Sequence, residues 1–272
     1  MGKFDGILLC TDLDATLLND EHIVSQENIA AIEYFKAEGG MFTFVTGRVP
    51  SGARLMLEYV KPNAPVVTFN GAGIYDFEKN ELLWGTYLDD KAKEIIEYAE
   101  NRMPGMGLVV CTDEKVYFPL LNPWVDEYYK LENFPLDTTY YRDISEKWKK
   151  ALFVSSNEDI LKIKQLVSES GMGENFDFVQ SCANYYEILP KGATKGTGLE
   201  RLAGILGIDR NKIIACGDNE NDITMIEYAG IGVAVENAID ALKSAADIVT
   251  VSNNEHAIAK VIKDIETGKI AI

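Results

Sequence analysis

The sequence is poor in basic side chains and has no long apolar run. Its 272 residues contain 26 lysines and arginines against 43 aspartates and glutamates, which gives a net charge of −17. A chain this acidic repels nucleic-acid phosphates and anionic lipids, so we expect neither nucleic acid nor a membrane as a partner. No apolar run approaches the ~20 residues that cross a bilayer, and the N-terminal segment lacks a signal-peptide profile. We therefore expect a cytoplasmic protein.

Cysteine and histidine are also scarce. The sequence has four cysteines: Cys10, Cys111, Cys182 and Cys216. Their spacing fits neither a zinc site nor a redox pair, and we expect buried thiols in strands, which suits a reducing cytosol. His22 and His256 have no neighbouring pattern of partners, so we expect them at the surface rather than among ligands or catalytic bases.

Short apolar runs recur along the chain and end in polar or glycine-containing motifs. Because they are rich in β-branched residues and closed by turns, we predict buried strands of a mainly parallel sheet. These runs are Gly6–Thr11, Met41–Val45, Pro65–Phe69, Lys212–Cys216 and Gly230–Val235. Segments with helical periodicity lie between them: Ser25–Glu38, Ser51–Tyr59, Thr197–Leu206, Asn221–Tyr228 and Ala238–Ala245. This alternation predicts an α/β fold with a doubly wound parallel sheet.

The middle of the chain departs from this alternation. Two helical stretches, Asp89–Arg102 and Asn157–Ser170, mix there with short alternating strands such as Lys115–Leu120 and Ala151–Ser155. At about 150 residues per domain, the length allows two modest domains. We predict an inserted α+β domain at residues 86–187 and a core formed by residues 1–85 and 188–272.

Two carboxylates follow the first predicted strand, in the segment Asp12-Leu13-Asp14-Ala15-Thr16. They stand at the carboxyl end of a parallel strand, where open α/β sheets bind ligands. Because the chain is leaving the strand, Asp12 and Asp14 can address one site. Taken alone, this motif is equally compatible with an aspartate-rich turn that has no function.

Three further motifs occupy comparable places. The segment Gly217-Asp218-Asn219-Glu220-Asn221-Asp222 adds carboxylates and amides at a helix start, where such residues also serve as N-caps. Thr46-Gly47-Arg48 offers a hydroxyl and a backbone N–H to a phosphate, although many strand-to-helix turns look similar. Lys195 stands at the start of a helix, although a lone lysine is ordinarily a solvated surface residue.

Together, and in this order, the motifs resemble those of the haloacid dehalogenase (HAD) superfamily of phosphotransferases. The residues that match its four motifs are Asp12–Thr16, Thr46, Lys195, and Gly217-Asp218 with Asp222. The segment Phe69-Asn70-Gly71-Ala72 and the large insert after it are similar to the Cof-type, type-IIB branch. The resemblance covers essentially the whole chain. It implies a HAD-like, Rossmann-type core with a cap domain that determines substrate specificity.

The resemblance implies a magnesium-dependent phosphatase of small phosphate monoesters, such as sugar phosphates or related metabolites. Asp12 would be the nucleophile that forms an aspartyl-phosphate. Asp14 would protonate the leaving oxygen and then serve as base for the attacking water. A small phosphorylated metabolite would be its partner, and nothing in the sequence indicates an oligomeric state.

The same resemblance assigns the ligands. Mg²⁺ would be bound by the Asp12 carboxylate, the Asp14 main-chain carbonyl and the Asp218 carboxylate. Asp222 would lie behind them and orient a metal-bound water or Lys195. The phosphate would be bound by Thr46, Gly47, Lys195 and Asn221.

Other residues carry open alternatives. Arg48 would either contact the substrate or pair with an acidic residue of the cap. Asn70 either shapes the site or only forms a turn before Gly71. In the inserted domain, Tyr117, Tyr185 and Tyr186 are candidate substrate contacts, although aromatic residues mostly form cores.

One position departs from the family pattern, because Ala15 stands where the family usually has glycine. Alanine does not adopt positive φ as cheaply as glycine. Since both carboxylates remain, we expect the chemistry to survive with an altered geometry or rate.

Two other functions share these motifs. A phosphomutase would form the same aspartyl-phosphate and return the phosphoryl group to the sugar. A non-catalytic phosphometabolite-binding protein would keep the scaffold, and Ala15 is compatible with it. Binding alone, however, does not require a nucleophile and an acid/base two residues apart.

Overall fold

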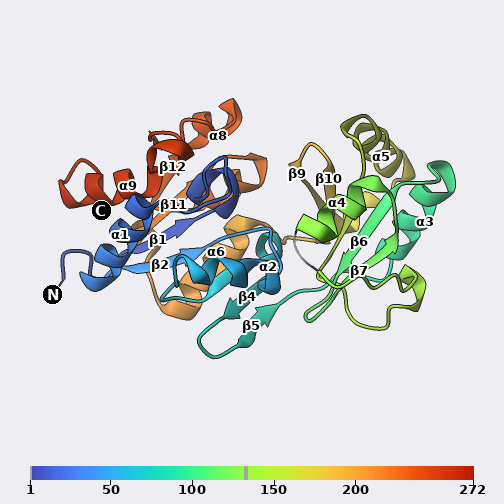
Figure 1. The fold of residues 1–272 in the computed structure, drawn as a ribbon, viewed down its shortest axis with the longest axis horizontal. Helices are drawn as coiled ribbons and strands as arrows, with labels where there is room; N and C mark the ends of the chain where they lie inside the picture. The colour runs from blue at the N-terminus through green and yellow to red at the C-terminus, as the bar shows by residue number, and fades with distance from the viewer. Residues whose placement is uncertain (1, 132–133) are drawn as a thin grey trace. The chain divides into compact units, whose positions relative to one another are not determined.

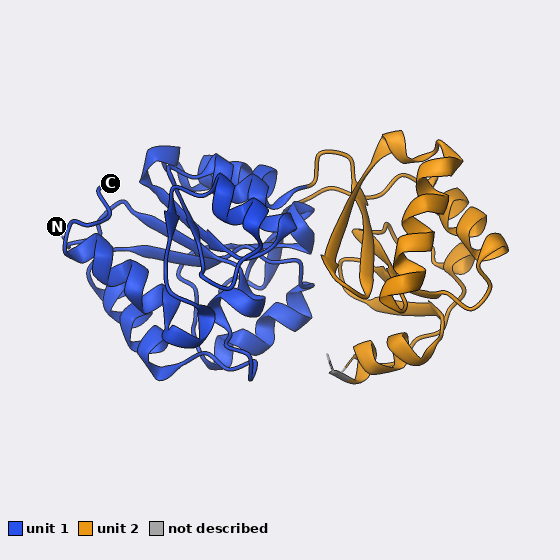
Figure 2. Ribbon diagram, turned by 90° about the horizontal axis from the view of Figure 1, so that it is seen from above, with its two compact units in different colours: residues 1–84, 194–272 blue, residues 85–193 orange. Residues whose placement is uncertain are grey.

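The computed structural model describes residues 2–131 and 134–272, which form two compact units (Figure 2). The core unit comprises Met1–Trp84 and Thr194–Ile272, and the inserted unit comprises Gly85–Ala193. The second boundary lies six residues beyond the predicted one. The reason is that strand β10 (Tyr185–Pro190) crosses residue 187 and pairs along its length with two strands of the inserted unit.

A five-stranded parallel sheet in the order β13-β12-β11-β1-β2 forms the centre of the core unit (Figure 1). Its strands are β1 (Leu8–Thr11), β2 (Met41–Phe44), β11 (Ile213–Gly217), β12 (Ile231–Ala234) and β13 (Ile248–Val249). The chain passes from β1 to β2 on one side and from β11 to β12 on the other. The connections therefore diverge between β1 and β11, where open α/β sheets bind ligands.

Helices cover both faces of this sheet. They are α1 (Gln26–Ala37), α2 (Pro50–Arg54), α6 (Lys195–Leu206), α7 (Ile223–Tyr228), α8 (Asp240–Ala245) and α9 (Ala257–Glu266). Leu9 packs in one hydrophobic cluster with α1 and α9, whereas Leu8 and Cys10 pack in a second cluster with α6, α7 and α8. Successive strand residues point to opposite faces. The doubly wound fold is thus confirmed, with α9 as a helix that our prediction did not include.

The predicted strand Pro65–Phe69 is largely outside the parallel sheet. Strand β3 (Val66–Thr68) pairs antiparallel with β4 (Gly73–Asp76), in a three-stranded sheet with β5 (Glu81–Gly85). An isolated parallel bridge from Val45 to Val67 joins it to β2. The cause is the turn after β3, where Asn70 has φ +54° and Gly71 has φ +99°, so that the chain reverses at once.

The inserted unit contains an antiparallel sheet in the order β7-β6-β8-β10-β9. Its other strands are β6 (Gly107–Cys111), β7 (Val116–Leu120), β8 (Lys150–Val154) and β9 (Phe176–Cys182). Its helices are α3 (Ala92–Arg102), α4 (Pro123–Leu131) and α5 (Asn157–Ser170). Side chains of α3 and α5 share a hydrophobic core with one face of the sheet. This is the inserted α+β domain that the sequence predicts.

Local capping explains why some helix bounds are predictable. The Ser156 hydroxyl accepts the N–H of Asp159 at the start of α5, and Gly171 ends the helix in the left-handed region with φ +66°. Serine caps and glycine stops of this kind depend on a few neighbouring residues. The predicted range Asn157–Ser170 therefore coincides with α5.

The cysteine prediction is correct for three of the four residues. Cys10, Cys111 and Cys216 are buried in strands, and burial raises the pKa of the Cys111 and Cys216 thiols to about 12. Cys182 is exposed, because it is the last residue of β9, the edge strand of the inserted sheet.

None of the helices described for this chain has the length and apolar character needed to traverse a bilayer.

Candidate active site

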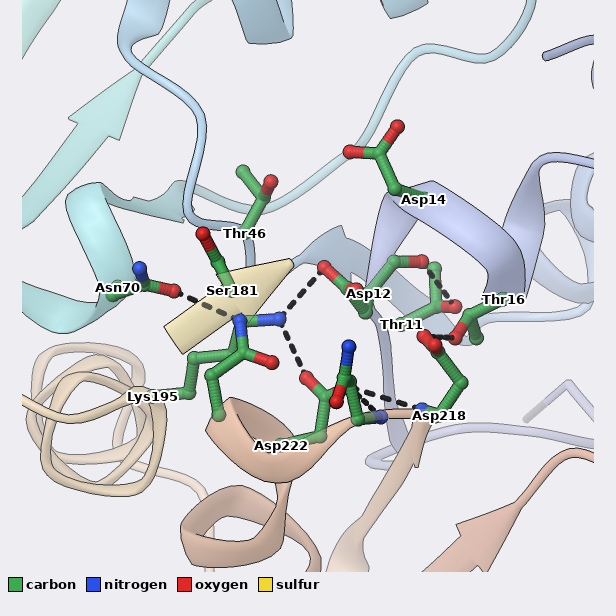
Figure 3. Close-up of polar contacts among 12 residues, drawn as sticks. Thr11, Asp12, Asp14, Thr16, Thr46, Asn70, Ser181, Lys195, Asp218 and Asp222 are labelled. Carbon is green, nitrogen blue, oxygen red and sulfur yellow. Dashed lines mark hydrogen bonds and ion pairs between the residues drawn. The ribbon is translucent and has the colours of Figure 1, made fainter. Parts of the chain in front are cut away.

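Polar side chains meet beyond the carboxyl ends of the core strands (Figure 3). Asp12 follows β1, Thr46 follows β2, Asn70 follows β3 and Asp218 follows β11. Lys195 is the first residue of α6. The parallel sheet therefore brings the four motifs of the sequence to one place, although long stretches of chain separate them.

Lys195 connects two carboxylates in the interior of the core unit. Its Nζ atom lies 2.7 Å from Asp12 Oδ1 and 2.5 Å from Asp222 Oδ1, and its side chain is fully buried. A capping box formed by Thr194 and Thr197 starts the helix directly before it. Burial opposes a charge on the Lys195 ammonium, but the two carboxylates hold its pKa above the ordinary value. Lys195 is thus a charged interior residue and not a solvated surface lysine.

Asp12 is buried and lies close to other acids. Its residue exposure is 7%, and its backbone N–H donates to the carbonyl of Cys216 over 2.9 Å, which continues the pairing of β1 with β11. Burial raises the pKa of the Asp12 carboxyl well above its usual range, the charges of Asp222 and Asp218 raise it further, and Lys195 opposes the rise. The lysine thus stabilises the ionised form that a nucleophile needs.

Asp218 faces the first motif through Thr16, whose hydroxyl donates to Asp218 Oδ1 over 2.8 Å. Burial, followed by the charge of Asp222, raises the pKa of Asp218 to about 7. The sequence prediction gave Thr16 a place in the motif but no contact. The pairing depends on β1 and β11 being neighbours in the sheet, which the sequence does not reveal.

Both carboxylate oxygens of Asp222 bind groups of the protein. Its Oδ1 receives Lys195, while Oδ2 accepts the backbone N–H groups of Asp218 at 2.9 Å and Asn219 at 3.0 Å. The loop can close this tightly because residue 217 is glycine: a Cβ there would lie 2.6 Å from the Cβ of Asp222. Asp222 therefore orients Lys195 and shapes the loop that presents Asp218.

The carboxylates fit a divalent cation. Oxygen atoms of Asp12, Asp218 and Asp222 all lie within 4.8 Å of one another. Since Asp222 already binds Lys195 and two N–H groups, Asp12 and Asp218 are the residues that offer carboxylate oxygens. Hard cations such as Mg²⁺ take oxygen ligands. A cation would also offset the burial and the mutual repulsion that raise the pKa values of Asp12 and Asp218.

Arg48 has a partner that our prediction did not include. Its Nε donates to Asp14 Oδ2 over 3.0 Å, and one terminal nitrogen donates to Asp14 Oδ1 over 2.7 Å. Burial alone would raise the pKa of Asp14, but the bidentate guanidinium lowers it below the usual value. The pair forms because β1 and β2 are adjacent, so the loops after them emerge side by side.

Asn70 lies between two residues that we expect to bind phosphate. Its Oδ1 accepts the side-chain N–H of Asn221 over 3.1 Å. A Cβ on Gly47 would lie 2.9 Å from the same oxygen, so only glycine fits there without a shift. Thr46 is close in the same loop, and its hydroxyl accepts the N–H of Arg48 over 3.1 Å. Asn70 therefore contacts the site in addition to forming its turn.

Ala15 stands where the family pattern usually has glycine, and its backbone adopts a conformation that glycine favours. Its φ is +55° and its ψ is 10°, in the left-handed region. The carbonyl of Ala15 accepts the side-chain N–H of Asn237 over 2.8 Å. Our prediction did not include Asn237, although it follows the strand run Gly230–Val235 in the way that the other motif residues follow their strands.

The tyrosine candidates lie mainly in the interior of the inserted unit. Tyr117 and Tyr186 are 4% and 8% exposed and belong to its hydrophobic core, and Tyr185 packs edge-on against Tyr128. The interpretation as core residues is thus correct for Tyr117 and Tyr186. His22 is exposed, and the side chain of His256 is 42% exposed, as expected of surface residues.

Comparisons with known proteins identify the family of this chain. A family model described as haloacid dehalogenase-like hydrolase matches residues 9–262. "Putative phosphatase YxeH" of Bacillus subtilis (strain 168) is 32% identical over 96% of this chain and 99% of its own length. "5-amino-6-(5-phospho-D-ribitylamino)uracil phosphatase YitU" of the same organism is 29% identical, over 94% and 96%.

A solved structure shows the same fold. "HAD Subclass IIB Sugar Phosphatase BT4131" superposes with a TM-score of 0.82, over 97% of this chain and 100% of that chain, at 22% identity. The family model spans nearly the whole chain, and a relative at 32% identity is matched over 99% of its length. This protein therefore belongs to the haloacid dehalogenase-like hydrolases and is a Cof-type phosphatase of that family.

Proposed function

We propose that this protein hydrolyses small phosphate monoesters, such as sugar phosphates or related metabolites, with Mg²⁺ as its cofactor and Asp12 as its nucleophile. The observation that carries the proposal is the buried Asp12 carboxylate, held 2.7 Å from Lys195 and facing Asp218 at the carboxyl end of the sheet. This arrangement supports attack on phosphorus, since it places a carboxylate nucleophile beside a cationic charge that favours its ionised form.

In the first step, a carboxylate oxygen of Asp12 forms a bond to phosphorus, and the bond between phosphorus and the ester oxygen breaks. The leaving oxygen takes a proton from Asp14, and an aspartyl-phosphate remains on Asp12. Asp12 and Asp218 would bind the Mg²⁺ ion together with the main-chain carbonyl of Asp14. When bound, this cation offsets the negative charge of the carboxylates and of the phosphate.

In the second step, Asp14 takes a proton from a water whose oxygen forms a bond to phosphorus. The bond between phosphorus and the Asp12 oxygen breaks, so that inorganic phosphate leaves and the Asp12 carboxylate is restored. The structure holds Asp14 in a bidentate pair with Arg48, which favours the ionised carboxylate that this step needs. The first step needs the protonated form, so the guanidinium must release Asp14 when the substrate binds. We propose that the Arg48 guanidinium leaves the Asp14 carboxylate when the substrate binds and contacts the substrate instead.

The phosphate oxygens would be bound by the Thr46 hydroxyl, the Gly47 N–H, Lys195 and the Asn221 amide. Asn221 donates one of its two side-chain N–H groups to Asn70, which fixes the amide and leaves the second for a phosphate oxygen. The lysine is already held in place by Asp222. This preorganisation lowers the cost of orienting donors around the transferred group.

We propose that the inserted unit is the cap that selects the substrate and excludes water during the reaction. Support for a small monoester comes from YitU, whose name specifies a phosphorylated ribityl compound as its substrate. The buried thiols of the core and inserted sheets support the cytoplasm as the location.

The experiment is phosphate release from a panel of sugar phosphates, nucleotides, cofactor phosphates and an aryl phosphate, with Mg²⁺ or with a chelator. Release that requires Mg²⁺ and disappears in Asp12→Asn supports the proposal, and the ranking of substrates narrows the class. An isomerised sugar phosphate without free phosphate would establish the mutase alternative instead. A folded protein that turns over no member of the panel would contradict the proposal.

A further inference from the structure

The turn that carries Asp14 has a backbone conformation that its own residues do not favour. Ala15 sits at φ +55°, which glycine adopts freely and alanine does not. The backbone N–H of Leu18 donates to the carbonyl of Leu13 over 2.9 Å and closes the turn. Two asparagine side chains from outside the turn donate to the carbonyl groups of Ala15 and Leu18.

These asparagines bind the middle of the turn and the residue that follows it, and they contact each other. Asn237 Nδ2 donates to the carbonyl of Ala15 over 2.8 Å. Asn253 Nδ2 donates to the carbonyl of Leu18 over 3.1 Å and to Asp20 Oδ1 over 3.1 Å. The backbone N–H of Asn253 donates to Asn237 Oδ1 over 2.9 Å, which joins the two supports.

The chemistry of these contacts requires an amide. Both Nδ2 atoms face carbonyl oxygens, so a carboxylate in their place would set lone pairs against lone pairs. Asn253 is only 2% exposed, and water therefore has little access to replace its bonds. Asn237 is exposed, so that water competes for the carbonyl of Ala15 and the loss of this bond costs less.

We propose that Asn237 and Asn253 are positioning residues, which hold the Leu13–Leu17 turn in its left-handed conformation and thereby place Asp14 for proton transfer. This inference rests on the proposed phosphatase function. It also accounts for Ala15, because a carbonyl fixed from outside stabilises a conformation that alanine alone would leave. Asn237 and Asn253 touch neither Asp14 nor the expected phosphate donors, so they act through the turn.

The test compares Asn237→Ala, Asn237→Asp and Asn253→Ala with the control Asn254→Ala. Both polar atoms of the Asn254 side chain bind Asp20, at 3.1 Å and 2.9 Å, rather than a carbonyl of the turn. We expect kcat to fall about tenfold in Asn253→Ala and about threefold in Asn237→Ala, with KM for the substrate unchanged. Asn237→Asp keeps the acceptor for the Asn253 N–H but loses the donor to the Ala15 carbonyl. The kcat of this variant should fall at least as far as that of Asn237→Ala. Asn254→Ala should retain the wild-type kcat.

A second substitution in the turn distinguishes an effect of Asn237 on the turn from a general loss of structure. Glycine adopts the conformation of residue 15 without support, so Ala15→Gly should restore most of the kcat that Asn237→Ala loses. A double variant no faster than Asn237→Ala overturns the proposal, as does a loss expressed in KM rather than kcat. An equal loss in Asn254→Ala also overturns it.

Amide hydrogen exchange gives a measurement that is independent of activity. Exchange of the Leu18 N–H should accelerate in Asn237→Ala and Asn253→Ala and stay unchanged in Asn254→Ala. Unchanged exchange in both turn variants overturns the proposal even if the wild type is active. If the wild type releases no phosphate, the proposed function fails, and the exchange data still decide whether the asparagines hold the turn.

Discussion

In the core unit, buried charged residues stand beyond the ends of strands, whereas in the inserted unit a buried pair stands within the sheet itself. Lys150 on β8 and Glu187 on β10 lie 2.8 Å apart with side chains 4% and 3% exposed. The Ser181 hydroxyl donates to the second Glu187 oxygen over 2.6 Å. In the core unit, by contrast, the lysine at position 195 is surrounded by several acids.

The two clusters differ in charge balance. In the inserted sheet, the buried Lys150 ammonium lies against the buried Glu187 carboxylate, so the charges of this pair balance. In the core cluster, Lys195 faces Asp12 and Asp222, with Asp218 close by, and the pKa values of Asp12 and Asp218 are raised. A balanced pair is typical of structure, while excess charge of one sign indicates a site that a ligand completes.

The largest effect should come from Asp12→Asn. We expect phosphate release to fall at least ~10⁴-fold, because the amide cannot act as nucleophile. The thermal midpoint should not fall, since the change removes one of several mutually repelling buried carboxylates. Initial rates and a thermal scan on the same preparation check both statements. A clear loss of stability would mean that the charges around Lys195 balance one another as those of Lys150 and Glu187 do.

Removal of the metal should have the next largest effect. Chelation of wild-type protein should lower the rate about a thousandfold, since a bound cation supplies several kcal/mol of charge stabilisation. Added Mg²⁺ at 100 times its Kd should stabilise the wild type by about 2.7 kcal/mol. Asp218→Asn should lose most of this stabilisation, measured by thermal shift. Equal shifts in the wild type and Asp218→Asn would contradict the assignment of Asp218 as a ligand.

Glu187→Gln should affect stability, because it leaves the Lys150 ammonium buried without its carboxylate. We expect the free energy of unfolding to fall by about 3 kcal/mol, measured by denaturant titration with hydrogen exchange of the inserted unit. The matched control is Glu158→Gln, whose partner Lys162 lies in an exposed pair with side chains 81% and 55% accessible. That change should cost less than about 0.5 kcal/mol. A similar loss of unfolding free energy in both variants would contradict the expectation that the buried pair contributes more than the exposed one.

The smallest of these effects should come from Arg48→Ala. We expect kcat to fall about tenfold, and Arg48→Lys should not restore it, because lysine cannot form the bidentate pair. Arg48 lowers the pKa of Asp14. Its removal should therefore raise that pKa in the free enzyme and move the alkaline limb of the kcat/KM profile, where Asp14 must be protonated, to higher pH. An unshifted limb would show that the pair does not control the ionisation of Asp14.

The sequence alone determined the features that depend on neighbouring residues. Apolar runs that end in polar motifs located the strands β1, β2, β11 and β12 and the residues Asp12, Asp14, Thr46 and Asp218 after them. Capping by Ser156 and Gly171 set the bounds of α5. These signals act over one strand or one helical turn, and they remain visible in a linear sequence.

Only the tertiary structure decided which of these residues meet. The bidentate contact of Arg48 with Asp14, the bond from Thr16 to Asp218 and the two asparagines on the Ala15 turn all join distant segments. The pairing of β10 within the inserted sheet and the exposure of Cys182 at its edge are of the same kind. Each depends on strand order and register, which arise from packing across the whole fold and leave no local pattern in the sequence.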